Sequence, residues 1–224
     1  MQFKIELGKL QAANLFASKD KTRYYLNGVL FEINGGKLHL ISSDGHRIIK
    51  IPVQIEGNKN PDDMKFIIPS SLIAKIKKAR GADTVELSIN KDEITIAYDG
   101  GTFTDKAIDG TFPDYTRAIP DQETAVKNEK DRRKKLEQKV AAAEFAQGGD
   151  VFEIGFNPKY LGDFAKVNEL LGFKGSGVRL NAMDAGSPVV VTMGGGMRDQ
   201  YLGVLMPMRV YLETPQGVAR CRRA

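Results

Sequence analysis

The sequence is poor in the residues that build disulfides, zinc sites and membrane spans. It has one cysteine among 224 residues, Cys221, which excludes an internal disulfide and any zinc site made of several cysteines. Tryptophan is absent, and aromatic residues make up only 8% of the chain. No apolar run approaches the roughly 18–20 residues of a membrane span, and the alternating start MQFKIELGKL is not typical of a secretion signal. We therefore expect a soluble globular protein of the reducing cytosol.

The net charge of +5 is unevenly distributed along the chain. Residues 127–139 hold seven basic and three acidic residues, and the terminal RCRRA adds three arginines. The rest of the sequence is slightly acidic. Basic charge confined to segments indicates contact with a polyanion over a defined surface, although a solvated helix and a frayed tail would have the same composition.

One pattern, a strand followed by a helix and three strands, occurs three times. Alternating apolar residues predict the strands and apolar stripes predict the helices. The first copy lies at 3–7, 8–18, 24–33, 37–42 and 46–53. The second lies at 65–68, 70–80, 85–89, 94–98 and 103–108, and the third at 152–156, 157–171, 178–180, 189–191 and 201–205. An internal repeat is an indication of the whole fold, and this one predicts an α+β protein.

A segment of different composition separates the second copy from the third. Residues 124–147 contain no proline or glycine and are rich in Lys, Glu, Ala and Gln, which predicts one long polar helix. We expect residues 1–120 to form one domain. We expect residues 121–210, including this helix, to form a second and shorter domain, followed by a basic tail at 211–224.

The sequence contains no motif for catalysis or metal binding. Asp44, His46 and Arg47 lie together, but no motif places a nucleophile beside them, and Asp44-Gly45 is ordinary turn sequence. The glycines at 194–196 lack the lysine and following helix of a phosphate-binding loop. The carboxylates lack metal-ligand spacing. We therefore expect a protein that is not an enzyme and uses no cofactor and no metal.

Five segments resemble the bacterial DNA polymerase III beta sliding clamp family. In the family's order they are RYYLNG (23–28), SDGHR (43–47), DGTFPDYTRAIP (109–120), FEIGFN (152–157) and LMPMRV (205–210). None is a generic turn or nucleotide motif. Residues 1–120 resemble the family's middle domain, and residues 151–210 resemble the second half of its last domain. The helix at 124–147 replaces the first half of that domain, and the family's first domain has no counterpart.

The resemblance implies the DNA-clamp fold, in which repeated βαβββ units form a ring with helices inside and sheets outside. It implies a processivity factor that encircles double-stranded DNA. Such a protein tethers a replicative DNA polymerase, and contacts the clamp loader, through short linear peptides. Because the family's rings have sixfold pseudo-symmetry, a chain of two bodies implies a homotrimer in preference to a dimer. The implied location is the cytoplasm of a bacterial cell, at the nucleoid, for a phage-like or divergent member.

Two other interpretations remain open at this point. The chain could be a non-ring clamp-like protein that captures clamp-binding peptides. It could also bind DNA without encircling it.

The resemblance also implies which residues contact DNA. A ring around DNA needs inward-facing positive charge, and the helix at 70–80 carries four cations and no acid. A tyrosine pair matches a DNA-touching element of the family, and the polar helix at 124–147 could face the same way. The candidates are Arg23, Tyr24, Tyr25, Lys75, Lys77, Lys78, Arg80, Arg132 and Arg133. Alternatively, the cations form a solvated face and the tyrosines pack within a strand.

The second implied site is an apolar groove for peptides with aliphatic and aromatic anchors. Flexible, polarisable methionines suit a groove that accepts varied peptides. The first cluster of matching positions is Leu26, Ser43, Gly45, His46, Arg47 and Ile48. The second is Pro113, Arg117 and Ala118, and the third is Val204, Met206, Pro207, Met208, Arg209 and Val210. The three clusters are far apart in sequence, and a single groove would unite them.

Overall fold

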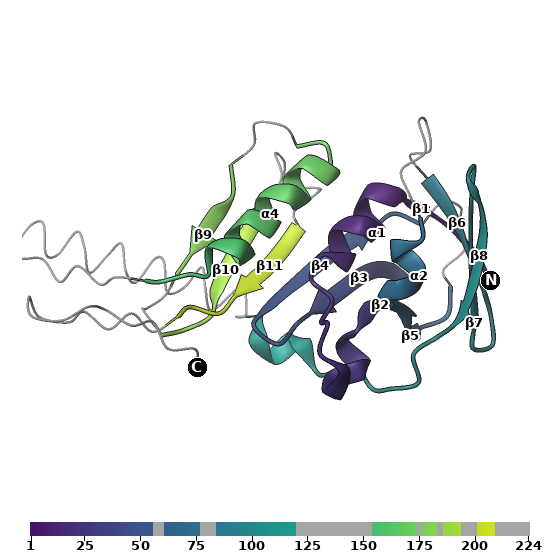
Figure 1. The fold of residues 1–224 in the computed structure, drawn as a ribbon, viewed down its shortest axis with the longest axis horizontal. Helices are drawn as coiled ribbons and strands as arrows, with labels where there is room; N and C mark the ends of the chain where they lie inside the picture. Colours follow the sequence, from purple (N-terminus) through teal and green to yellow (C-terminus); the bar gives the residue numbers. More distant parts are fainter. Residues whose placement is uncertain are drawn as a thin grey trace, which may run out of the picture.

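A computed structural model describes seven parts of the chain (Figure 1). These are residues 1–55, 61–76, 84–119, 154–173, 177–182, 186–193 and 201–208. The predicted helix at 124–147 and the tail at 211–224 lie outside the described residues. Within them, no helix is both long and apolar enough to cross a membrane.

The order of strands and helices predicted for the first two copies is confirmed, but the helix predicted at 70–80 ends at Ala74. The first consists of β1 (Gln2–Glu6), α1 (Leu7–Asn14), β2 (Gly28–Asn34), β3 (Lys37–Ser43) and β4 (Arg47–Val53). The second consists of β5 (Met64–Pro69), α2 (Ser70–Ala74), β6 (Thr84–Asn90), β7 (Glu93–Tyr98) and β8 (Gly101–Lys106). Alternation explains strands such as β1, in which Phe3 and Ile5 are buried and their neighbours are exposed.

Each copy contributes its first strand to the sheet of the other copy. Strand β1 pairs antiparallel with β6, so the four-stranded sheet has the order β1-β6-β7-β8. Strand β5 pairs antiparallel with β2 and begins a sheet that continues through β3 and β4. Across this second pairing, Phe31 lies opposite Phe66 and their rings stack at 4.4 Å. The two copies therefore interlock into one body.

The third copy extends the second sheet. It comprises α4 (Pro158–Leu170), β9 (Arg179–Asn181), β10 (Val189–Met193) and β11 (Tyr201–Leu205). Where a first strand was predicted at 152–156, the described residues from 154 on form only one bridge, between Gly155 and Met208. Strand β11 pairs antiparallel with β4, which gives a seven-stranded sheet in the order β5-β2-β3-β4-β11-β10-β9. Figure 1 shows the third copy continuing the first body along this sheet. The two predicted domains thus share a sheet.

The three helices lie beside one another, with α1 in contact with both α2 and α4. A Cβ atom added to Gly8 would lie 2.4 Å from the carbonyl oxygen of Leu170, so α1 and α4 approach at the level of the backbone. A Cβ on Gly203 would lie 2.3 Å from the ring of Phe164, which packs against β11 at this glycine. One hydrophobic core therefore runs through all three copies, and the contact between Phe16 and Phe164, 4.9 Å between ring centroids, lies within it.

The predicted strand at 24–33 is wrong in its first part. Residues Lys21–Leu26 form a 3₁₀-helix, η1, and β2 begins only at Gly28. The side chain of Asp20 caps η1 by accepting a hydrogen bond from the backbone N–H of Thr22, at 2.9 Å. A local cap therefore overrides the β-strand preference of two consecutive tyrosines.

Candidate functional site

The first and third predicted clusters lie on paired strands. In the β4–β11 pair, Leu205 lies opposite Arg47 and Val204 lies opposite Ile48. Beyond the end of β11, the backbone N–H of Met206 donates to the carbonyl oxygen of His46, at 2.9 Å. The segments SDGHR and LMPMRV, distant in sequence, therefore meet side by side.

The β3–β4 turn that presents His46 is held by its own side chains. The Asp44 carboxylate accepts hydrogen bonds from the backbone N–H groups of His46 (2.9 Å) and Arg47 (3.1 Å). The Ser43 hydroxyl donates to the carbonyl of Arg47 (2.9 Å) and accepts from the N–H of Gly45 (3.0 Å). Gly45 has a φ of 91°, which favours glycine. Ser43 is buried and supports the turn, whereas His46 is exposed.

Arg47 connects this turn to the third copy. Its Nε donates to Asp44 (3.0 Å), its Nη1 to Asp163 on α4 (2.7 Å) and its Nη2 to the carbonyl of Leu15 (3.1 Å). Burial disfavours the charged form of Asp163, but hydrogen bonds from Arg47 and Lys166 outweigh it and hold the pKa of Asp163 below its ordinary value. With only 5% of its side chain exposed, Arg47 supports the surface from beneath.

Aromatic rings enclose the Arg47 guanidinium. Its Cζ lies 4.5 Å from the centroid of Phe16 and 4.4 Å from that of Tyr160. The Tyr160 ring also stacks on His46 at 6.3 Å. Arg47 and Tyr160 thus form the underside of the surface around His46.

The second cluster lies on residues 107–119, which we call the strap. The N–H of Ile108 donates to the carbonyl of Ile67 on β5, at 3.0 Å. Farther along, Tyr115–Ala118 form a second 3₁₀-helix, η2, capped by the side chain of Asp114. Pro113 and Arg117 are exposed, and Ala118 is half-buried.

A small second core joins the strap to the other two clusters. It consists of Leu30, Ile41, Ile67 and Tyr115. Ile48 packs against it, and so does Ile119 at the end of the strap. Because Ile48 also lies opposite Val204, all three clusters share one neighbourhood.

The predicted groove residues divide by exposure. Gly45, His46, Pro113, Arg117 and Met206 are exposed. Ile48, Ala118, Pro207 and Met208 are half-buried, and Leu26, Ser43, Arg47 and Val204 are buried. Arg209 and Val210 lie outside the described residues. The accessible part is therefore an apolar and weakly basic surface, on which Met206 is 40% exposed.

Sequence reasoning missed Tyr160 and Asp163 as parts of this site. Both lie on α4, and no motif marks either position. The only sequence signal for Asp163 is a carboxylate next to the apolar residue Phe164 on an amphipathic helix, where the structure buries it.

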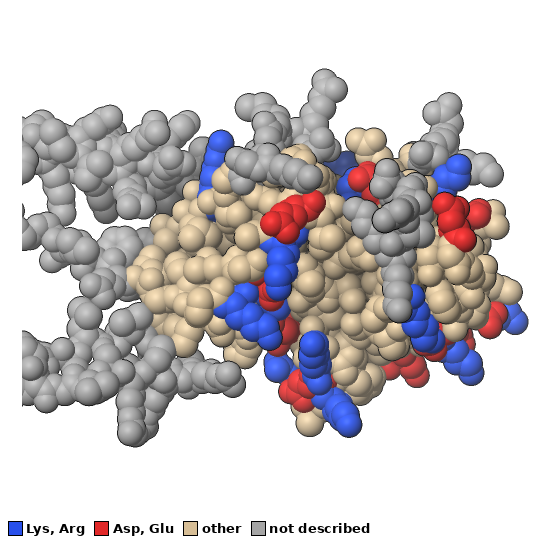
Figure 2. All heavy atoms as spheres, turned by 45° about the horizontal axis from the view of Figure 1, so that its top comes forward, with Lys and Arg blue, Asp and Glu red and all other residues tan. Residues whose placement is uncertain are grey.

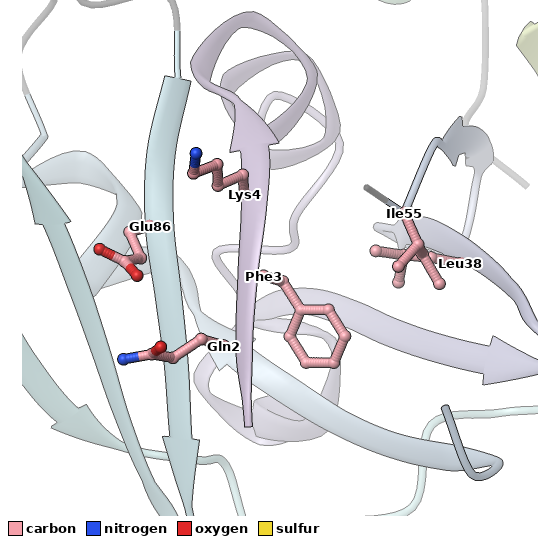
Figure 3. A pocket seen from close by; sticks show the side chains of 6 residues that line it. All are labelled: Gln2, Phe3, Lys4, Leu38, Ile55 and Glu86. Carbon is pink, nitrogen blue, oxygen red and sulfur yellow. The ribbon is translucent and has the colours of Figure 1, made fainter. Parts of the chain in front are cut away.

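Two hollows are present in the described structure, and only the second is lined by one of these exposed residues, Pro113. One, of about 230 Å³, is formed by β1, β6, Leu38 on β3 and Ile55 (Figure 3). None of its lining residues belongs to the predicted clusters. The other, of about 570 Å³, lies between the strap and strands β2 and β5.

The predicted DNA-contacting residues are spread over several elements. Arg23 is half-buried, pairs with Asp20 at 3.2 Å and packs against Gly45. Tyr24 is 53% exposed, whereas Tyr25 packs against the second core. Lys75 is exposed at the end of α2. Lys77, Lys78, Arg80, Arg132 and Arg133 lie outside the described residues.

Charge on the visible surface is mixed in sign. Figure 2 shows Lys and Arg interspersed with Asp and Glu. On α4, Lys159 and Lys166 are exposed, and Lys166 pairs with Asp163 at 3.2 Å. Across the described ranges, no group of three or more His, Cys, Asp or Glu residues could hold a metal ion.

His39 is expected to make stability depend on pH. Burial and the nearby charge of Lys50 lower the pKa of His39 from 6.5 to about 4, against the opposing effect of Glu32. The unfolded chain therefore binds a proton between pH 6.5 and 4 that the folded chain does not, and stability falls as the pH drops through this window. We expect a loss of about 2 kcal/mol, measured by urea unfolding at several pH values. His39→Gln should remove this loss, and an identical pH profile in the variant would contradict the assignment.

The paired βαβββ units, whose sheet continues into the third copy, have the arrangement of a DNA polymerase sliding clamp. Residues 7–114 match the family of the DNA polymerase III beta subunit, central domain. The Beta sliding clamp of Caulobacter vibrioides is 30% identical, and the match covers 92% of this chain and 64% of that protein. The corresponding protein of Escherichia coli is 26% identical, with 90% and 62% covered. These matches support a divergent, shortened member of the bacterial beta sliding clamp family.

Solved structures agree with this assignment. The DNA polymerase sliding clamp of Pseudomonas aeruginosa superposes with a TM-score of 0.63 and 25% identity, covering 93% of this chain and 66% of that one. The clamp of Bacillus subtilis gives a TM-score of 0.68 at 16% identity, covering 94% and 65%, which supports the fold alone. The chain thus spans slightly less than two thirds of the length of these relatives.

Proposed function

We propose that the protein is a DNA sliding clamp, a non-catalytic processivity factor. In this role it encircles double-stranded DNA and tethers a replicative polymerase through short linear peptides, and the clamp loader uses the same groove. The observation that carries the proposal is the β4–β11 pairing, which unites the SDGHR and LMPMRV segments beside the strap. The names of the relatives support the same role. The proposed place of action is the bacterial cytoplasm, at the nucleoid.

The helical side of the molecule is the proposed DNA-facing side. The helices α1, α2 and α4 adjoin one another, and Lys75 and Lys159 are exposed at the ends of α2 and α4. Sliding requires attraction to phosphates without base-specific contacts, which exposed lysines provide.

Reversing charge on this side is expected to reduce retention on DNA. Lys75→Glu combined with Lys159→Glu should shorten the lifetime on nicked circular DNA and lower the slope of log affinity against log salt by about two. The matched control is Lys37→Glu with Lys91→Glu, which alters exposed lysines at the start of β3 and in the β6–β7 turn, away from strands β8 and β9. Equal loss in both double variants would count against a helical DNA-facing side.

Encirclement also requires self-association, and we propose a homotrimer. Within the described residues, β8 is an outer strand of the four-stranded sheet and β9 an outer strand of the seven-stranded one. Both offer backbone groups to another chain. Light scattering should give about three times the chain mass of 24.7 kDa. A monomer at every concentration would contradict the ring.

A second candidate is a non-ring clamp-like protein that captures clamp-binding peptides or binds DNA without encircling it. It is favoured because β4, the outer strand of the first copy, already pairs with β11 of the same chain and is closed to a partner. Linearising the DNA discriminates the two, because a ring slides off free ends and a surface-bound protein does not.

A further inference from the structure

The strap is attached to the sheet by a backbone hydrogen bond and by side chains at the second core. The N–H of Ile108 bonds to the carbonyl of Ile67 on β5. Tyr115 lies in the second core, and Phe112 and Ile119 pack against it. Residues 110–116 also form one wall of the 570 Å³ hollow, so part of this stretch faces open space. The placement of Pro113 and η2 therefore depends on these few attachments, of which Tyr115 is the buried one.

Tyr115 makes the buried attachment of the strap, beside the proposed groove. It is 9% exposed, and its ring lies in the second core with Leu30 and Ile67. The Nζ of Lys50 lies 5.6 Å from its ring centroid. Its hydroxyl donates a hydrogen bond to the carboxylate of Glu32 on β2.

Glu32 is a buried carboxylate whose partners all converge on this attachment. It is 4% exposed, and the Nζ of Lys65 on the neighbouring strand β5 lies 2.6 Å from its Oε1. Burial works against its charged form, but hydrogen bonds from Lys65 and Tyr115 outweigh burial, and the pKa of Glu32 lies below its ordinary value. Burial and the bond to Glu32 raise the pKa of Tyr115, so its hydroxyl stays protonated as a donor.

We propose that Tyr115, through its hydrogen bond to Glu32, is a positioning residue for peptide capture. It fixes the strap so that Pro113, Arg117 and Ala118 are held as one wall of the groove, and it does not itself touch the peptide. This inference rests on the proposed function, because it assigns a role within the same groove.

The test compares variants that keep the fold and change this one bond. Tyr115→Phe should weaken binding of a fluorescent peptide with aliphatic and aromatic anchors about tenfold, the loss expected for a hydrogen bond to a charged group, mainly through faster dissociation. Glu32→Leu should act in the same way, and the double variant should lose no more than either single one. Glu32→Gln keeps an acceptor oxygen for the Tyr115 hydroxyl and should bind the peptide nearly as the parent does. Tyr98→Phe, which alters a half-buried tyrosine on β7, is the matched control and should bind as the parent does.

Amide hydrogen exchange supplies a second readout. Tyr115→Phe should speed exchange within the strap and leave β6 and β7 unchanged. Equal peptide affinity in the parent and Tyr115→Phe overturns the positioning role alone. A Glu32→Gln variant that binds the peptide as weakly as Glu32→Leu also overturns it. A parent protein that binds no such peptide overturns the proposed groove and this role with it.

Discussion

Replacing Arg47 with alanine is expected to lower the free energy of unfolding by about 3–5 kcal/mol, the usual cost of removing one partner from a buried ion pair. The guanidinium bonds Asp44, Asp163 and a backbone carbonyl and lies between two aromatic rings. Without it, the carboxylate of Asp163, 8% exposed, keeps only the partly exposed Lys166 as a cationic partner. Urea unfolding of both proteins at neutral pH measures the difference.

Arg117 provides a matched control for Arg47. Each arginine pairs through Nε with an aspartate three residues earlier, at 3.2 Å for Arg117 and 3.0 Å for Arg47. The Arg117 side chain is 87% exposed, so Arg117→Ala should cost no more than about 0.5 kcal/mol. Similar losses for the two variants would mean that burial does not determine how much Arg47 contributes to the free energy of unfolding. Arg47→Lys should lie between them, because lysine keeps the charge and loses the planar fork.

The second large effect is expected on peptide capture. Met206→Ala combined with Met208→Ala should weaken binding by about 1–3 kcal/mol in total, the usual range for truncating apolar anchors at an interface. Met206 is exposed beside His46, and the N–H of Met208 donates to the carbonyl of Gly155 at 2.8 Å. Fluorescence anisotropy with a labelled clamp-binding peptide measures the change.

A control for the methionine variant is available on β9, an outer strand of the same sheet. Leu180 on β9 is 43% exposed and lies outside the three clusters. Leu180→Ala should leave peptide affinity unchanged. Unchanged affinity in the methionine variant as well would place the groove elsewhere on the molecule.

The repeated elements were predictable because they depend on local patterns. Alternation marks β1 directly, and the Asn157-Pro158 start marks α4, where the Asn157 side chain accepts from the N–H of Lys159 at 3.0 Å. The 3₁₀-helix η1 was not predicted. The strand preference of Tyr24 and Tyr25 competes there with the helix cap at Asp20, and the surrounding packing decides which of the two conformations forms.

The composition of the candidate site was predicted from the resemblance, but its internal arrangement was not. Arg47 was expected to line a groove, and the structure buries it against α4. Its partner Asp163 is remote in sequence, and no local pattern reports which buried acid will meet which buried base. The same holds for Glu32 and Tyr115, which are joined only because the strap crosses the sheet.

The exchange of first strands between the two copies has a consequence for how the chain must fold. Neither copy can complete a sheet from its own strands, because β1 pairs with β6 of the second copy and β5 pairs with β2 of the first copy. Folding must therefore await synthesis of both copies and then proceed as one cooperative step. If the backbone were cleaved between β4 and β5, the two fragments would remain associated as a noncovalent complex, and neither fragment would fold alone.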